Sequence, residues 1–468
     1  MNAGDYRKCI SFVLIDEQYV RNYVSSGVIN DLSQYFNVQL VVPDHIEPIK
    51  DLGSLIMVEY YKSDQKNAAV HGRILNHLTW LYRGYSSSFR FRRARRNGLF
   101  LKGIQKRSLS KREKALLYFR RIGWWLFRHH RHIFENRLVS PVYLKYLKSQ
   151  ISINKSLRSA LSRKGMDLVC CPVSVFDYDA IDLLEITKEL SIPTLFIADN
   201  WDNVSSKTVY IDKPTHFAVI GEQSKNHAIA IQGFSSKDVS AIGSARFSRY
   251  FIDRDKKLVS PYNFSYILFT GTALMFDEET CLEILADVLD SNHELFGDVK
   301  IVYRPHPARQ IEASFKPKAL SNRVILDSKH KIRTGGDPID PMSNTDLEHY
   351  SMLLSNAELV VGGLTTMLLE ASIFYKTFIA LAHDDGVNFT SQNRVLQGYE
   401  HLKGIEKLPN VQMVHSLNEL AQVFVKAWDQ RLIADHLDID MKRNHFLFDN
   451  EQRFSDRLSS LMRRICIS

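Results

Sequence analysis

A series of short apolar runs, each about the length of one strand, restricts the fold of this chain more than any other feature. The runs at 10–15, 194–198 and 266–270 are nearly all apolar and show no regular alternation with polar residues. Strands have this character when both of their faces are buried, as in a parallel sheet with helices on both sides. The sequence therefore predicts an α/β protein built on parallel sheets.

The runs fall into two groups, which a largely polar stretch at 250–263 separates. Apolar residues at helical spacing between the runs at 10–15 and 38–42 predict a βαβ opening. A chain of 468 residues is also too long for one ordinary core. We therefore expect two doubly wound, Rossmann-like domains at 1–250 and 264–435, then C-terminal helices at 436–468, with ligands in the cleft at the carboxyl ends of the strands. The predicted strands are 10–15, 38–42, 166–171, 194–198, 217–220, 239–242, 266–270, 300–303, 358–361 and 377–381.

Composition and hydropathy predict a folded cytoplasmic protein. Hydrophobic residues make up 45% of the chain and charged residues 24%, which is ordinary for a globular protein. The first apolar run is too short for a signal peptide, and no run approaches the roughly 18 apolar residues of a membrane span. Two of the five cysteines, Cys170 and Cys171, are neighbours on an apolar run, which favours reduced core residues over disulfides or a metal site.

The net charge of +9 is concentrated in one segment. Between Arg83 and Arg137 there are 17 lysines and arginines and two acidic residues, within a helical texture that runs from about 70 to 160. We interpret this region as a basic helical insertion in the first domain. Its aromatic residues favour an anionic membrane surface, on the inner face of the cytoplasmic membrane, or a lipid-linked acceptor. A solvated helical face is the second interpretation and single-stranded nucleic acid the third. Because nucleic acid ranks last, we expect no nucleic-acid partner. The residues assigned to the membrane are Arg92, Arg93, Arg95, Arg96, Trp124 and Trp125.

The segment 303–309 (YRPHPAR) follows a predicted strand directly. Two prolines stiffen it, so Arg304 and His306 are held at the end of the strand with little entropy left to lose. A guanidinium fork suits phosphate oxygens, and a histidine adds a donor whose charge adjusts near neutral pH. The alternative is a rigid connection whose arginine caps a helix.

Two further loops in the second half carry the pattern of a phosphate site. Gly362, Gly363, Thr365 and Thr366 stand between a predicted strand and a helix, where backbone N–H groups and the helix dipole favour an anion. Glu370, one turn on, is expected to accept from ribose hydroxyls. An ordinary helix cap accounts for the same residues. Gly271 and Thr272 follow another strand, where added phosphate donors and a plain strand–helix link are equally open.

In the first half, the loop 199–207 follows the predicted strand 194–198. It holds two carboxylates, two amides and a tryptophan that we expect to be exposed. Such a set can bind sugar hydroxyls and hold a reactive carboxylate, whereas an Asx turn with a buried tryptophan is the structural alternative. We assign Asp199 and Asp202 to catalysis. The residues assigned to the acceptor or sugar are Asn200, Trp201, Asn203, Lys207 and Asp177.

The motifs at 304–307 and 362–370 together resemble the nucleotide-binding half of bacterial GT-B glycosyltransferases. They look most like the enzymes of surface-polysaccharide assembly that use CMP-linked acidic sugars of the Kdo and sialic acid type. The resemblance implies that His306, Pro307, Thr365 and Thr366 contact the nucleotide, with Arg304 and Glu370 less securely placed. The segments 199–203 and 241–247 also look like parts of bacterial surface-polysaccharide transferases. Similar motifs occur in enzymes that use CDP-linked alditols, and similar sheets bind UDP-sugars.

Together these features predict a GT-B glycosyltransferase that moves a sugar from a nucleotide donor, favoured as a CMP-linked ulosonic acid, onto a glycan or lipid-linked glycan. No zinc spacing and no Walker-type loop occur in the sequence, so we expect a metal-independent enzyme without a cofactor. A UDP-, GDP- or CDP-linked donor and a nucleotide-sugar epimerase are the enzyme alternatives. A basic protein that binds membranes or RNA is the non-enzyme alternative.

Overall fold

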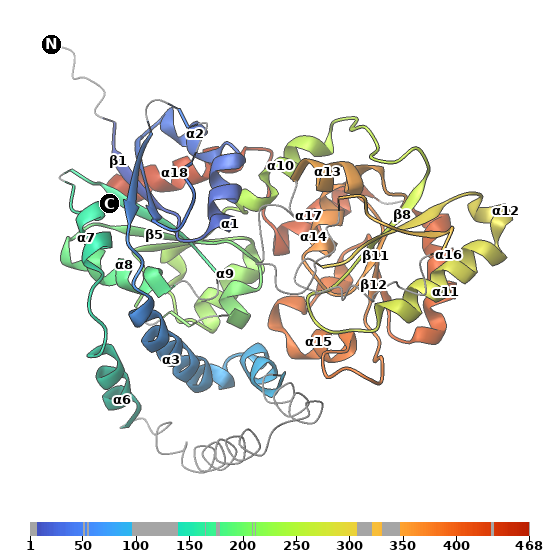
Figure 1. Ribbon diagram of the computed structural model, residues 1–468, viewed down its shortest axis with the longest axis horizontal. Helices are drawn as coiled ribbons and strands as arrows, with labels where there is room; N and C mark the ends of the chain where they lie inside the picture. Colours follow the sequence, from blue (N-terminus) through green and yellow to red (C-terminus); the bar gives the residue numbers. More distant parts are fainter. Residues whose placement is uncertain are drawn as a thin grey trace.

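The fold consists of two parallel sheets, each covered by helices on both faces (Figure 1). The computed structural model describes residues 7–49, 52–53, 56–95, 139–163, 165–174, 178–207, 209–210, 212–306, 321–329, 347–431 and 435–467. Pro307, Asp177, Arg96, Trp124 and Trp125, which the sequence assigns to the site or to the membrane, lie outside these residues. The two doubly wound domains expected from the apolar runs are confirmed.

The first sheet has the strand order β3-β2-β1-β4-β5-β6-β7, and every pair is parallel. Its strands are β1 (Cys9–Val13), β2 (Asn37–Pro43), β3 (Met57–Tyr61), β4 (Leu168–Val173), β5 (Thr194–Ala198), β6 (His216–Val219) and β7 (Val239–Ala241). Alternate residues of one strand belong to opposite cores, because successive side chains point to opposite faces. Thus Phe12 packs beneath the helices on one face and Val13 beneath those on the other. This two-sided burial is what the unalternating apolar runs require.

The second sheet has the order β10-β9-β8-β11-β12-β13 and is also parallel throughout. Its strands are β8 (Tyr266–Thr270), β9 (Lys300–Arg304), β10 (Val324–Leu326), β11 (Val360–Gly362), β12 (Phe378–Leu381) and β13 (Val411–Val414). The order of the strands reverses between β1 and β4 in the first sheet and between β8 and β11 in the second. Ligands of open α/β sheets bind at that switch point, outside the carboxyl ends of the strands.

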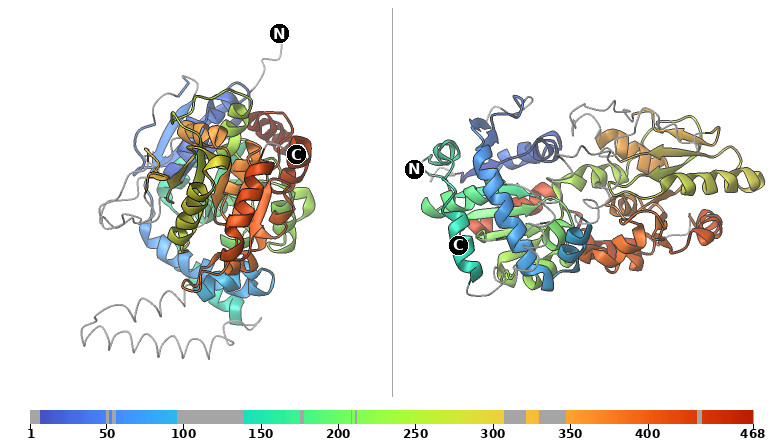
Figure 2. Two further views of the ribbon diagram at one scale, coloured as in Figure 1. Left: turned by 90° about the vertical axis from the view of Figure 1, so that its right-hand side faces the viewer. Right: turned by 60° about the horizontal axis from the view of Figure 1, so that its bottom comes forward.

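The helices of the first half are α1 (Glu17–Tyr19), η1 (Val20–Ser25), α2 (Val28–Ser33), α3 (Gln65–Leu81), η2 (Tyr82–Gly84), α6 (Val139–Lys148), α7 (Lys155–Leu161), α8 (Tyr178–Glu189), η3 (Asn203–Lys207), α9 (Glu222–Ala230), η4 (Ser236–Asp238) and α10 (Ala245–Arg254). The helical pattern predicted after the first strand is divided into α1, the π-helix η1 and α2. Gly27, with φ of 85°, allows the turn before α2. Figure 2 shows α3, in blue, running along the side of the first domain.

The helices of the second half are α11 (Glu278–Ser291), α12 (His293–Phe296), α13 (Leu347–Asn356), α14 (Met367–Ile373), α15 (Gln392–Gly398), η5 (Glu400–Leu402), η6 (Ile405–Lys407), η7 (Leu417–Glu419), α16 (Leu420–Gln430), α17 (His436–Phe446) and α18 (Phe454–Ile467). The last helix returns to the first domain. Leu458 and Met462 of α18 share a core with Ile10 of β1, and Figure 1 shows α18 beside β1 and α2. The chain therefore crosses between the domains twice, through α10 and through α17. None of the helices described is long and apolar enough to cross a membrane.

Candidate active site

Asp199 lies immediately after β5, at the carboxyl edge of the first sheet. The side chain is completely buried. Its Oδ2 accepts a hydrogen bond of 2.6 Å from the Gln18 amide, and its Oδ1 accepts one of 2.9 Å from the Asn22 amide. Burial raises the pKa of Asp199, while the bond from Asn22 and the charge of Arg246 oppose that rise. A raised pKa makes a carboxylate a better base than an ordinary aspartate, which suits general acid–base catalysis.

The amides that hold Asp199 come from the segment after β1. Gln18 is in α1 and Asn22 is in η1, so both follow the carboxyl end of a strand that is two positions away from β5 in the sheet. Asn22 also accepts two hydrogen bonds from the Arg21 guanidinium, at 3.1 and 3.0 Å. Neither amide was assigned a role from the sequence.

Arg246 connects this carboxylate to the second domain. It is in the first turn of α10, and its charge acts on Asp199. Its Nη2 lies 2.7 Å from Oε1 of Glu370 and donates to Oγ1 of Thr366 at 3.3 Å. Glu370 is only 1% exposed and was expected to accept from a ribose. In this structure it pairs with Arg246 instead, so a ribose contact would need a rearrangement of that ion pair.

The glycine turn after β11 is packed closely against the loop after β8. A Cβ atom at Gly363 would come within 2.2 Å of Cγ2 of Thr272, and one at Gly271 within 2.8 Å of the His306 backbone nitrogen. Glycine at these two positions therefore lets three loops meet at the carboxyl edge of the second sheet. Thr365 and Thr366, predicted as nucleotide contacts, are half-buried there.

The side chains of Thr272 and Arg304 are more deeply buried than is usual for side chains that contact a ligand directly. Thr272 is 2% exposed, and its backbone N–H and hydroxyl both bond to Glu278. Arg304 is also buried. It forms an ion pair with Asp327 and lies 4.2 Å from the centre of the Tyr350 ring. These contacts hold the loop of the half-buried His306 in place, and nucleotide binding by Arg304 and Thr272 stays a prediction.

Asp327 is shared by more than one donor. Tyr262 donates to its Oδ1 at 2.8 Å, and Nε2 of His349 lies 2.8 Å from the same oxygen. Removing one partner of a buried ion pair is costly, because the charge that remains is neither paired nor hydrated. Arg304 is thus fixed to the sheet edge by a network, which is a structural role that the strand-end position alone did not reveal.

The tryptophan of the loop 199–207 is buried, and the expectation that it is exposed was wrong. Trp201 is 2% exposed and packs edge-on against His401 and Phe446, with ring centroids 4.9 and 6.2 Å away. His401 belongs to η5, between β12 and β13, and Phe446 is the last residue of α17. Burial of the large apolar surface of a tryptophan stabilises the folded state. Trp201 therefore joins the domains in this structure.

The other polar residues of the loop are mostly engaged within the protein. Asn203 is buried and donates to the Val173 carbonyl at 2.9 Å, and the Asn200 side chain accepts from the next backbone N–H. Asp202 pairs with Lys207 at 3.1 Å. Burial by itself would raise the pKa of Asp202, but the charges of Lys207, His401 and Arg92 and the hydrogen bond from Lys207 together lower it. The two predicted carboxylates therefore differ in character, and Asp199 is the one with proton-exchange potential.

A helical segment at 87–95, where the basic insertion begins, bridges the two domains. Arg92 donates to the carbonyls of Ser206 and Lys207 at 2.5 and 3.0 Å. On the other side, the Phe91 ring covers Gly398, where a Cβ atom would lie 2.4 Å from it. Arg92 thus points to protein carbonyls, whereas Arg93 and Arg95 are partly exposed. The membrane role of all three stays a prediction.

A buried histidine at the domain junction, His401, leads us to expect that the folded protein loses stability in acid. Burial lowers the pKa of His401 to about 4, beneath Trp201 and beside Ser206. The unfolded chain, in which histidine titrates near 6.5, binds a proton that the folded junction rejects. Stability is therefore fully present above about pH 6.5 and falls as the pH drops towards 4, by up to about 3 kcal/mol from this residue. Urea unfolding at pH 7 and pH 5 measures this, and His401→Gln should reduce the difference. An equal pH dependence in that variant would contradict the assignment.

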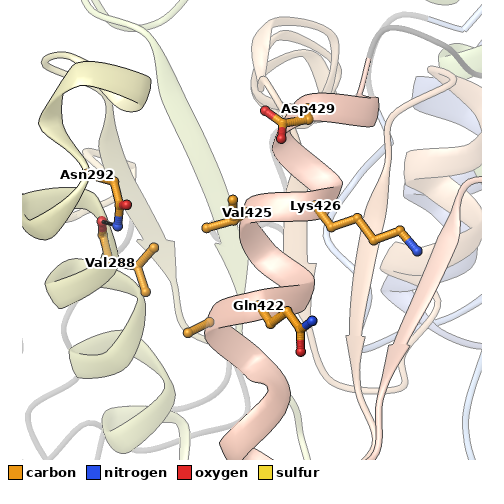
Figure 3. A pocket seen from close by; sticks show the side chains of 7 residues that line it. Val288, Asn292, Gln422, Val425, Lys426 and Asp429 are labelled. Carbon is orange, nitrogen blue, oxygen red and sulfur yellow. Dashed lines mark hydrogen bonds between the residues drawn. The ribbon is translucent and has the colours of Figure 1, made fainter.

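One groove lies away from these residues. It has a volume of about 510 Å³ and opens between α11 and α16, on the outside of the second domain. Figure 3 shows Val288 and Asn292 on one helix facing Gln422 and Val425 on the other. No predicted site residue lines it. Asp199, Arg246 and Thr366, at the carboxyl edges of the two sheets, are therefore the better candidate site.

Comparisons with solved structures identify the fold. No known family model matches the chain, and no curated protein is similar to it. UDP-GlcNAc 2-epimerase from Neisseria meningitidis, bound to UDP-GlcNAc, is 12% identical over 98% of this chain and 99% of that chain, with a TM-score of 0.52. A putative UDP-N-acetylglucosamine 2-epimerase from Listeria monocytogenes is 10% identical over 97% and 96% of the chains, with a TM-score of 0.51. The fold is GT-B. At these identities the similarity extends to the arrangement of the chain and not to its activity.

Proposed function

We propose that this GT-B chain is an enzyme that acts on a nucleotide-activated sugar in the cleft between its domains. The observation that carries the proposal is the position of Arg246, which bonds to Thr366 of the hydroxyl turn on one sheet edge and acts through its charge on Asp199, a carboxyl with a raised pKa, on the other. A nucleotide sugar needs both parts. Its phosphate gains negative charge as the sugar bond breaks, and its acceptor or sugar ring needs a group that takes a proton.

The residues divide between two tasks in this proposal. Thr365, Thr366 and His306 hold the nucleotide phosphates at the carboxyl edge of the second sheet. Asp199 acts as the general base for the group that attacks or changes the sugar, with its geometry fixed by two amides. Asp202 is paired with Lys207 and keeps a lowered pKa, so it is assigned to the loop rather than to the proton transfer.

We propose a UDP-linked sugar as the first donor to test, ahead of the CMP-linked ulosonic acid that the motifs suggest. The support is that the two epimerases of the same fold are named for a UDP-sugar. Glycosyl transfer to a glycan or lipid-linked glycan is the proposed reaction. The basic insertion supports glycosyl transfer, because a basic segment would bring the enzyme to an acceptor at an anionic membrane surface. Epimerisation of the nucleotide sugar is the second candidate, which the same two structures favour.

Nucleotide binding is the first expected result. In a thermal-shift screen, UDP should stabilise the purified protein more than CMP, CDP or GDP. A ligand at a hundred times its dissociation constant adds about 2.7 kcal/mol to the free energy of unfolding, which is visible as a higher melting temperature. Stabilisation by CMP alone would return the acidic-sugar donor to first place. The absence of any shift with all four nucleotides would contradict the proposed function.

The two reactions are then separated by omitting the acceptor. Incubated with UDP-GlcNAc alone, an epimerase forms the epimer, whereas a glycosyltransferase releases little UDP until a glycan acceptor is added. Product analysis with and without acceptor reads out both. The metal-independent reaction predicted from the sequence is checked in the same assay with a chelator.

A further inference from the structure

Arg246 is placed where a donor bound on the second domain would meet the first domain. Its α-carbon belongs to the first turn of α10, whose N-terminus follows the carboxyl end of β7. Its guanidinium reaches across to α14 and bonds to Thr366, one of the two threonines predicted to hold phosphate. The positive end of the ten-residue helix α10 adds to the attraction for an anion at this point. The side chain is 23% exposed, so ligand can reach it.

The hydrogen bonds of Arg246 leave part of its donor set available. Glu370 and Thr366 both engage Nη2. Within the described part of the chain, Nε and Nη1 have no hydrogen-bond partner, and neither is among the buried polar atoms that lack one. These two nitrogen atoms are therefore not buried, in agreement with the partial exposure of the side chain. In this guanidinium Nη2 is fixed, whereas Nε and Nη1 are open. Such an arrangement suits phosphate oxygens, which accept hydrogen bonds from parallel N–H groups.

Glu370 holds this guanidinium in position. The carboxylate is 1% exposed and lies 2.7 Å from Nη2, and the guanidinium carbon is also 5.5 Å from the centre of the Phe247 ring. An arginine that is already oriented loses less conformational entropy when it binds a ligand. The ion pair thus has a purpose beyond joining the domains, because it fixes the direction of the open donors.

We propose that Arg246 binds the diphosphate of the nucleotide sugar, so that the first domain contacts the donor held on the second. This inference rests on the proposed function and names the part of the substrate that Arg246 recognises. The competing role is a latch, in which the Arg246–Glu370 ion pair only joins the domains. The two roles differ in what is lost when each partner of the pair is removed.

Titration calorimetry with UDP, uridine and inorganic pyrophosphate tests the proposal. Arg246→Gln should lower the affinity for UDP and pyrophosphate about ten- to a hundredfold, because it removes charged hydrogen bonds, and leave uridine unchanged. Arg249→Gln is the matched control, since Arg249 lies one turn further along α10 and pairs with Asp253 and Glu348. It should bind UDP within twofold of the wild type. Arg246→Lys, which keeps the charge, should recover part of the loss.

Glu370→Gln separates phosphate binding from the latch. It breaks the ion pair but keeps the guanidinium, so UDP affinity should fall less than in Arg246→Gln. Equal losses in the two variants would establish the latch and overturn the proposal. So would wild-type affinity for UDP in Arg246→Gln, which leaves the proposed function intact. If the wild type binds pyrophosphate through Arg246 but no nucleotide, the proposed function fails and the anion site stands. If it binds neither, both fail.

Discussion

Replacing Asp199 with asparagine is expected to lower turnover of the donor about a thousandfold, because a general base of this kind contributes roughly 10² to 10⁴ to the rate. The asparagine has nearly the same shape and still accepts one hydrogen bond, so the loop should keep its position. Nucleotide affinity should change less than about threefold, since the phosphates are assigned to the other domain. Steady-state kinetics and UDP titration measure the two quantities separately.

Asp212→Asn is the matched control for this substitution. Asp212 is on the surface of the same domain, where it pairs with Lys148 and its side chain is 56% exposed. Turnover in this variant should match the wild type. Near-normal turnover in Asp199→Asn would remove Asp199 from the catalytic role. A thousandfold loss that is accompanied by a collapse of nucleotide binding would point to damage of the whole cleft.

Replacing Trp201 with alanine is expected to lower the free energy of unfolding by about 3–5 kcal/mol, the usual cost of removing a buried aromatic side chain. The indole packs between His401 and Phe446, so the cavity would open at the junction of the domains. Urea unfolding followed by circular dichroism measures the loss. Trp201→Phe should lose less, because it keeps a ring in the site.

Leu437→Ala provides a comparison at the surface, where the side chain is 75% exposed and the expected change is within about 0.5 kcal/mol. The sequence assigned Trp201 to the sugar. If Trp201→Ala is as stable as the wild type yet binds acceptor or donor poorly, that assignment is right and the packing role is wrong.

The sequence predicted every interior strand of the two sheets and one edge strand, β7. β5 and β8 coincide with the apolar runs 194–198 and 266–270. The three strands that were missed, β3, β10 and β13, are all at sheet edges. An edge strand has one neighbour and a partly solvated face, so its residues need not be uniformly apolar. Only pairing with the next strand makes such a segment a strand, and a single sequence does not show pairing.

For a similar reason, only some residues of the candidate site can be recognised in the sequence. Asp199, Thr366 and Glu370 stand out locally, because each follows a strand or begins a helix. Their partners do not. Gln18 is 181 residues from Asp199, and Arg246 is 124 residues from Glu370, so these contacts exist only after the sheets and the second domain have formed. A lone amide carries no pattern that marks it beforehand, and the resemblance of the segment 241–247 to transferases assigns no role to Arg246.

Burial was the property that the sequence predicted least well in the loops. Trp201 and Arg304 were expected at a binding surface, on the argument that strand-end loops carry function. Both are covered by residues from distant segments, His401 for one and Tyr350 for the other. Whether a loop side chain meets a ligand or a second loop depends on the packing of both, which the local sequence does not contain.

A crystal structure of the chain grown with UDP tests the central claim most directly. The account predicts the diphosphate in the cleft between the domains, within hydrogen-bonding distance of Thr365, Thr366 and the open donors of Arg246. Asp199 should lie across the cleft on the side where the sugar would extend. UDP bound elsewhere, such as in the groove between α11 and α16, or an empty cleft at saturating UDP would contradict it.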